Sequence, residues 1–208
     1  VPFLVWHAGL ARPGGSNDAL LNFCNFAPTV CDWCGVKPPT GLPERSFLPI
    51  LEEEHPAGWD ETFFAHNFHE LQMHYPYRVL RGRQYKFVEN IVSGAVNQLP
   101  SDLWSSPTWR AVRENGLRQM GQRSVEAFLN QPAEALYDIQ SDPQETRNRI
   151  ADPTLAGVAE AMRARLQDFR LRTADPWLDA SIQAAEPNLE ERVRQYQAER
   201  QRRARQRQ

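Results

Sequence analysis

The sequence has little cysteine, little net charge and no long apolar run, and each shortage argues against a class of protein. Three cysteines among 208 residues do not make the framework of a small disulfide-rich domain. No apolar stretch reaches the length of a membrane-spanning helix. A formal net charge of −2 gives the whole chain no attraction to nucleic acid or acidic lipid, so neither is an expected partner.

Apolar and aromatic residues are well represented. The chain is 41% hydrophobic, with six tryptophans and ten phenylalanines, which predicts a packed core rather than disorder. The end differs, because residues 186–208 hold seven arginines against four glutamates. We expect this tail to be a solvated helix or disordered. Its final RQRRARQRQ has no interleaved aromatic residue and is only a weak signal for nucleic-acid binding.

The hydrophobic pattern predicts a mixed α and β chain. The opening VPFLVWHAG is typical of a fully buried strand, which needs neighbours on both sides. A chain that opens inside such a strand is expected to have residues upstream. Alternating segments predict three further strands in ETFFAHNF, YRVLRGR and QYKFVENI, the last two joined as a hairpin near Gly82, and another strand in EALYDI.

Helix signals lie before, between and after these strands. Asn25 as a cap, Pro28 in the first turn and Gly35 as a stop predict a short helix. Others are expected in SFLPILEEE, SPTWRAVREN and SVEAFLNQ. Asp142 and Asp152, each followed by proline, are typical helix starts. The second opens a helix whose apolar stripe should pack against the strands: Leu155, Val158, Ala159, Met162, Leu166 and Phe169.

Three of the five histidines surround Glu70 in AHNFHELQMHYPYR. On a regular strand His66 and His69 point to opposite faces, so the two do not ligate one metal ion together. A substrate-binding role of His69, Glu70 and Arg78 is one interpretation of this stretch. The other is a histidine-rich strand that merely packs, and composition does not separate the two.

The cysteine and acidic motifs have ordinary structural explanations. CDWC is half of a zinc or redox motif, and the chain has no second pair. Cys24, Cys31 and Cys34 fall near one side of the expected helix, so we predict that they are small core residues. The EEE run at residues 52–54 is expected to be a solvated helix face. The chain contains no glycine-rich phosphate loop, H-E-x-x-H or G-x-S-x-G motif.

Several segments together resemble one family. LYDIQSDPQETRN, the long helix that follows it and TADPW resemble the C-terminal end of the sulfatases. VPFLVWHAG and NFAPTVCDWCGVKPPTGLPERSFLPIL agree with this. HNFHELQMHYPYRVLRGRQYKFVEN is similar to the heparan N-sulfatase (sulfamidase) branch. Together the segments cover nearly everything from Val1 to about Trp177.

The resemblance implies a division of the chain. Its first part would be the end of an alkaline-phosphatase-like α/β domain, in residues 1–60. Residues 61–180 would form a small α+β domain in which a long helix packs on an antiparallel sheet. Residues 181–208 would be the tail, rich in arginine, glutamine and glutamate.

The chemistry implied by the resemblance lies elsewhere. Sulfatases hydrolyse sulfate esters or sulfamates with a formylglycine made in a C/S-x-P-x-R motif and with a Ca²⁺ ion. None of the three cysteines stands in that motif, and the calcium ligands of the family would precede Val1. The resemblance therefore implies no catalytic residue and no metal ligand here, with formylglycine and Ca²⁺ expected in a missing N-terminal part.

The resemblance also implies a site. In the relatives the segment that matches FHELQMHYPYR approaches the sulfate pocket, so His69 and Glu70 are expected to contact the sugar of a sulfated saccharide. Arg78 would hold an anionic group or tie its strand to the large domain. Pairing of Glu70 and Arg78 with each other or with nearby backbone is the structural alternative.

Three functional hypotheses follow. The first is the C-terminal part of a sulfatase that acts on a sulfate ester or sulfamate of a sugar, with heparan-type N-sulfoglucosamine favoured, and that is inactive alone. The second is a stand-alone module that binds sulfated carbohydrate, and the third is surface binding through the arginine-rich tail. Relatives work in the periplasm, in lysosomes or outside the cell, and the residues of this chain do not distinguish among these locations.

Overall fold

The computed structural model describes residues 3–11, 13–70 and 73–179. The chain divides into two compact units, Val1–Thr173 and Ala174–Gln208. The described part of the second unit contains a short 3-10 turn, η4 (Pro176–Leu178). The boundaries expected near residues 60 and 180 stay predictions, and the tail at 186–208 lies outside the described residues.

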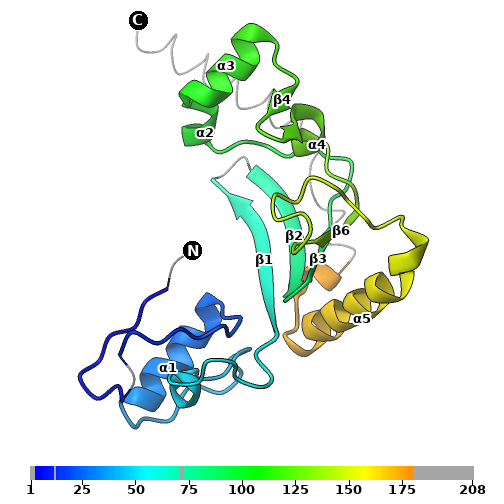
Figure 1. Ribbon diagram of the computed structural model, residues 1–208. Coiled ribbons are helices and arrows are strands. Elements are labelled where there is room, and N and C mark those ends of the chain that lie inside the picture. Colours follow the sequence, from blue (N-terminus) through cyan, green and yellow to red (C-terminus); the bar gives the residue numbers. More distant parts are fainter. Residues whose placement is uncertain (1–2, 12, 71–72, 180–208) are drawn as a thin grey trace, which may run out of the picture. The chain divides into compact units, whose positions relative to one another are not determined.

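A four-stranded antiparallel sheet organises the first unit (Figure 1). Its spatial order is β1-β2-β3-β6, formed by β1 (Glu61–His69), β2 (Met73–Gly82), β3 (Tyr85–Asn90) and β6 (Glu134–Asp138). Arg83 and Gln84 make the turn between β2 and β3, which confirms the predicted hairpin at Gly82. The expected α+β class, an antiparallel sheet packed by a long helix, is confirmed.

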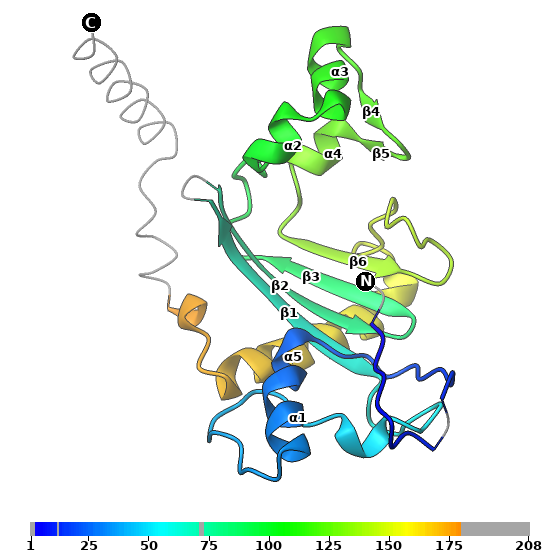
Figure 2. The same cartoon turned by 90° about the vertical axis from the view of Figure 1, so that its left-hand side faces the viewer.

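The long helix α5 (Ala156–Arg172) covers one face of this sheet (Figure 2). Side chains alternate along each strand, so every second residue points at the helix. The phenyl rings of Phe63 and Phe169 stack with centroids 4.0 Å apart. The predicted apolar stripe of the helix is confirmed, because it completes the core formed by Phe63, Leu80, Phe87, Leu136, Ala159, Met162 and Leu166.

Ion pairs at the edge of this core fix the helix against particular strands. Arg163 binds both carboxylate oxygens of Glu134 at 2.7 and 2.6 Å. Arg170 is buried and contacts both oxygens of Glu89 at 2.9 and 2.8 Å. The two pairs tie α5 to β6 and β3, and of the two arginines only Arg170 is buried.

Before the sheet, the chain forms η1 (Phe23–Asn25), α1 (Phe26–Trp33) and η2 (Leu48–Ile50). The predicted helix with Pro28 in its first turn is confirmed, and Asn25 is its N-cap, although the Asn25 side chain makes no capping bond. The Asn22 side chain caps the preceding turn η1. The Asn22 carboxamide oxygen accepts from the Cys24 N–H at 2.7 Å. Gly35 ends the helix with a φ of 66°, the left-handed conformation that glycine adopts without strain.

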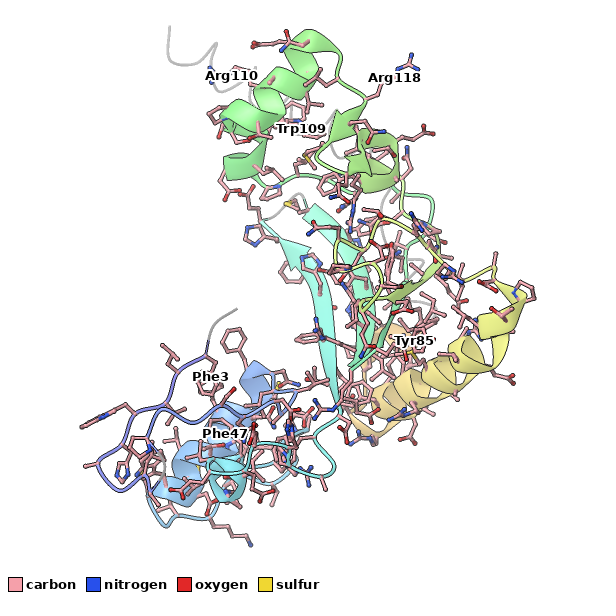
Figure 3. All side chains as sticks on the ribbon, in the orientation of Figure 1. Phe3, Phe47, Tyr85, Trp109, Arg110 and Arg118 are labelled. Carbon is pink, nitrogen blue, oxygen red and sulfur yellow. The ribbon has the colours of Figure 1, made fainter. Side chains whose placement is uncertain are left out.

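The prediction of a buried strand in the opening segment was wrong, because residues 3–9 form no strand. The side chains of Leu4 and Trp6 are 92% and 84% exposed. A buried strand needs neighbouring strands, and no described strand pairs with this segment. Phe3 instead packs edge-on against Phe26 and Phe47, with centroids 5.1 and 5.5 Å apart (Figure 3).

The cysteine prediction was also wrong. Cys24 and Cys34 are exposed and Cys31 is half-buried. Helix α1 turns its other side inward, where Thr29 donates to the Asn25 carbonyl and accepts from the Phe47 N–H at 2.6 and 3.0 Å. These buried hydrogen bonds decide which face of α1 is covered.

Two further helix predictions failed. Residues 52–54 are exposed but lie outside any helix, since the preceding segment forms only the 3-10 turn η2. No helix begins at Asp142, whose carboxylate accepts instead from the Thr146 and Arg147 N–H groups at 2.7 and 2.8 Å. Glu145 has a φ of 53° and pairs with Lys86 at 2.7 Å. A left-handed residue at this position is incompatible with a helix.

Between β3 and β6 lie α2 (Ser101–Ser105), α3 (Pro107–Asn115), β4 (Gln119–Met120), β5 (Arg123–Ser124) and α4 (Val125–Leu129). Helices α3 and α4 were predicted, and the Ser106 and Ser124 hydroxyl groups cap them at 3.1 and 3.0 Å. Helix α2 and the β4–β5 pair were not predicted. Within the described residues, no helix has both the length and the apolar character needed to cross a bilayer.

Truncation of the α5 core should destabilise the chain strongly. Leu166 is 1% exposed in the core beneath the sheet. We expect Leu166→Ala to lower the free energy of unfolding by about 2–5 kcal/mol, through lost burial and the cavity left behind. Leu171→Ala on the same helix, at a side chain that is 62% exposed, is the matched control. Equal urea midpoints for the two variants would contradict this packing.

Asp152 should contribute a measurable acid sensitivity. Hydrogen bonds from Thr154, followed by the pairing with Arg149, lower the pKa of Asp152 from 3.8 to about 2. A carboxyl whose pKa is lowered by folding stabilises the fold above its unfolded pKa. That stability is lost as the pH falls from about 4 through about 2. In acid melting curves, Asp152→Asn should lose less stability over this window than the parent chain, because asparagine still caps but does not titrate. If Asp152→Asn and the parent chain lost the same stability over this pH range, Asp152 would not be the source of the acid sensitivity.

Candidate substrate-binding site

The candidate site lies at the end of the β1–β2 hairpin, where the strand pairing is interrupted. The register shifts between His66 and Phe68, and at that point Tyr75 and Pro76 together oppose Asn67. Strand β2 is central, so a proline inside it is tolerated only at such a bulge, because proline has no N–H to donate. β-Bulges recur next to functional sites, where they re-aim side chains.

Two buried polar groups at this bulge lack hydrogen-bond partners. The Tyr75 side chain is 2% exposed, and neither its hydroxyl nor the Asn67 Oδ1 atom has a partner among the described residues. Burial raises the pKa of Tyr75, which keeps the hydroxyl protonated at neutral pH. A buried unsatisfied polar group costs about 1–3 kcal/mol, and native proteins tolerate few such groups, often for a functional reason.

His66 is fixed by packing rather than presented to solvent. Its Nδ1 atom lies 3.0 Å from the Tyr75 carbonyl oxygen. A carbonyl only accepts, so Nδ1 carries the proton. The imidazole stacks on the Tyr77 ring with centroids 4.8 Å apart and planes 8° from parallel. For this histidine the interpretation of a packed histidine-rich strand holds.

His69 and Glu70 lie together where β1 ends. His69 is exposed and is the last residue of the strand. Glu70 adopts a φ of 57°, and its Oε1 atom accepts from the Ser101 N–H at 3.0 Å and from the Ser101 hydroxyl at 2.6 Å. The carboxylate therefore caps the first residue of α2 and joins the hairpin end to that helix. A left-handed glutamate is uncommon and strained, a condition found most often at functional positions.

Arg78 lies farther along the sheet. Its side chain is 4% exposed, and Nη1 donates to the carbonyl oxygens of His66 and Tyr77 at 2.9 and 3.0 Å. Met73 is the strand partner of His69. Arg78 lies five positions after Met73 in β2, which is about 16 Å along an extended strand. The backbone thus groups His69 with Glu70 but places Arg78 apart. The substrate-binding roles of all three residues stay predictions.

An open groove of about 520 Å³ lies at the other end of the sheet, beside the β2–β3 turn. Its arginines are already engaged, since Arg83 pairs with Asp18 at 3.0 Å and also with Asp60, and Arg165 pairs with Glu61. Charges that are paired within the chain add little to ligand binding. The hairpin end is the better candidate.

Sequence reasoning missed the bulge and the contact with Ser101. One signal was available, because a proline inside an otherwise regular strand pattern indicates a bulge or an edge strand. Nothing local to Ser101 indicates its contact with a residue 31 positions earlier.

Comparison with known proteins defines the class as sulfatase. A family model described as "N-sulphoglucosamine sulphohydrolase, C-terminal" matches residues 1–108, which is more than half of the chain and includes the whole hairpin. The chain therefore belongs to the N-sulphoglucosamine sulphohydrolase C-terminal family, as the resemblance predicted.

Individual relatives agree with this family. Human N-sulphoglucosamine sulphohydrolase is 28% identical over 190 residues, covering 86% of this chain and 38% of the human protein. An ulvan-active sulfatase from Formosa agariphila is 25% identical, covering 78% of this chain and 31% of the relative. A solved structure described as a 2-O GAG sulfatase aligns with a TM-score of 0.49 and 20% identity, covering 79% of this chain and 29% of the other. The chain thus spans well under half the length of the relatives it matches.

The residues described here do not fit the Ca²⁺ ion that the resemblance implies. In the ranges that the structure describes, no group of three or more histidine, cysteine, aspartate or glutamate side chains could hold a metal ion.

The link between Glu70 and Ser101 can be tested directly. Without the Glu70 carboxylate, the N–H at the start of α2 loses its acceptor, and the helix should fray. We expect Glu70→Ala to speed amide hydrogen exchange throughout Ser101–Ser105. Glu126→Ala, at an exposed glutamate in the first turn of α4, should leave α2 exchange as it is. Unchanged α2 protection in Glu70→Ala would refute the capping role.

Proposed function

We propose that this chain is the C-terminal part of a hydrolase that removes sulfate from a sulfate ester or sulfamate of a sugar. The observation that carries the proposal is the family match over residues 1–108, since that stretch contains the bulged hairpin and both His69 and Glu70. Relatives across 78–86% of the chain are named as sulfohydrolases or sulfatases.

The nucleophile and the metal of the reaction would come from a preceding part of the protein. No cysteine here stands in a C/S-x-P-x-R sequence, and the described side chains form no metal-binding group. On this proposal formylglycine and Ca²⁺ act from that other part, and the present residues bind and orient the sugar. The chain alone is then inactive toward sulfate esters and sulfamates.

N-sulfoglucosamine of the heparan type is the favoured substrate. The family description and the human relative both name N-sulphoglucosamine, whereas a similarly distant relative is named for ulvan. His69 is exposed at the hairpin end, so its ring is free to meet a sugar there. Glu70, beside it, would also contact the sugar, and Arg78 would hold an anionic group or tie its strand to the large domain.

Exposed apolar residues near the start of the chain support a larger assembly. They are spread over residues 3–36, beside and on α1, and include Leu4, Trp6, Phe23, Val30, Trp33 and Val36. Covering such side chains with another surface would be favourable, because it removes apolar area from water. Packing against the large sulfatase domain would bury these side chains.

Binding and turnover separate the proposal from its alternative. We expect the chain to bind an N-sulfated glucosamine disaccharide in calorimetry and to release no sulfate from it. His69→Ala should weaken binding by about tenfold, the loss of one ligand hydrogen bond worth about 1.4 kcal/mol. His55→Ala, at an exposed histidine that pairs with Asp18 at 2.7 Å, should bind like the parent chain.

The results distinguish three cases. Sulfate release by the chain alone would contradict the division of labour proposed here. Equal binding by the two histidine variants would remove His69 from the site. Binding without turnover, in a protein shown to have no catalytic partner, would favour the alternative of a stand-alone module that recognises sulfated carbohydrate.

A further inference from the structure

The cysteines of α1 form an arrangement that the sulfatase role does not use. Cys31 lies in the last turn of the helix and Cys34 is its C-cap. All three cysteines are free thiols, and Cys34 is exposed while Cys31 is half-buried. The C-x-x-C spacing therefore places two oxidisable thiols at one helix end, with Cys34 exposed to solvent.

The backbone around the pair is fixed by hydrogen bonds. The Val36 N–H donates to the Cys31 carbonyl at 2.9 Å, and the Gly35 N–H donates to the Asp32 carbonyl at 3.1 Å. These two bonds, with Gly35 left-handed, make a Schellman motif. The Cys34 N–H still bonds to the Val30 carbonyl at 3.0 Å. Cys31 and Cys34 thus keep helical spacing, which separates their Cα atoms by about 5 Å.

This spacing permits one disulfide and excludes the others. A disulfide needs a Cα separation of about 4.4–6.8 Å, which Cys31 and Cys34 meet. Their Cβ atoms, about 5–6 Å apart on a regular helix, must approach to about 4.5 Å when the bond closes. Cys24 is seven residues before Cys31 along the same helical run, a rise of about 10 Å, and is too far for either partner. Burial also raises the pKa of Cys24, helped by the charge of Glu44, which lowers its thiolate fraction.

We propose that Cys31 and Cys34 are a redox modification site that closes to an intrachain disulfide when a small-molecule disulfide is the oxidant. The Cys34 thiolate attacks one sulfur of that oxidant, forming a mixed disulfide and releasing one thiol. The Cys31 thiolate then attacks the Cys34 sulfur and releases the second thiol. The protein loses two protons and two electrons, and the oxidant is reduced to two thiols.

Formation of the Cys31–Cys34 disulfide would stabilise the packing around the C-terminal end of α1. Trp33 stands between the two cysteines, and its ring packs edge-on against His7 with centroids 4.7 Å apart. Asp32 accepts from the Ser46 hydroxyl at 2.8 Å. The disulfide therefore fixes the helix end that holds both the opening segment and the segment leading to η2. Constraining this loop in the unfolded chain should raise the melting temperature by a few degrees.

The test treats the full 208-residue chain with oxidised glutathione and then alkylates the remaining thiols for mass spectrometry. We expect the chain to lose two of its three thiols and two hydrogens, with Cys31 joined to Cys34 and Cys24 alkylated. Cys24→Ser should close in the same way. Cys31→Ser should stop at the mixed disulfide on Cys34, and Cys34→Ser should form no intrachain link. In urea, the Cys31–Cys34 disulfide should form at least about tenfold more slowly, because the unfolded chain no longer holds the two thiols close together.

Three outcomes would overturn the proposal: three free thiols after treatment, a disulfide that contains Cys24, or a closure rate that urea leaves unchanged. None of these outcomes bears on the sulfatase role, because the pair lies in α1 and not at the hairpin end. The binding experiment with His69→Ala can fail while disulfide closure succeeds, and the reverse is equally possible.

Discussion

Burial of one sheet face beneath α5 is the interaction on which the described fold depends. The core draws Phe63, Leu80, Phe87 and Leu136 from four strands and covers them with a helix that begins twenty residues after the last strand's leucine. A small antiparallel sheet is marginal in water unless a helix or another sheet covers one face. Because Arg163 and Arg170 each bind a glutamate on a particular strand, the helix has one register on the sheet.

The bulge at Pro76 interrupts the strand pairing near the end of the β1–β2 hairpin. A regular ladder would have turned Asn67 and Tyr75 to predictable faces, each beside a cross-strand partner. The missing N–H of the proline interrupts the ladder and leaves two buried polar atoms without partners in the described residues. The rest of β2 packs against α5, whose ion pairs reach the neighbouring strands β3 and β6. The stable half of the hairpin thus supports the strained half, where Glu70 is left-handed.

The parts predicted correctly from the sequence are those that depend on local pattern. Alternation located β1, β2, β3 and β6, and the 3.6-residue stripe located α5, because both periods follow from backbone geometry. Burial of the opening segment and of the cysteines was predicted wrongly, since burial depends on which neighbours are present and not on the side chain alone. The helix expected at Asp142 failed because a distant residue, Lys86, holds Glu145 in a turn. A substrate-binding role of His69, Glu70 and Arg78 was one of two interpretations of this stretch, and only the family resemblance favoured it over a strand that merely packs.

The three histidines of the hairpin show why residue type alone does not define a site. His66 is held by a carbonyl and a tyrosine ring, so its hydrogen-bonding capacity is partly used and its ring has no freedom to follow a ligand. His69 is two residues past the start of the bulge and is exposed, so the same imidazole is available there. The difference arises from the backbone, not from the side chain. Relatives named for unlike substrates match this same stretch. Because His69 is exposed beside the bulge while Arg78 is buried, mutagenesis that tests the proposed sugar contact begins at His69.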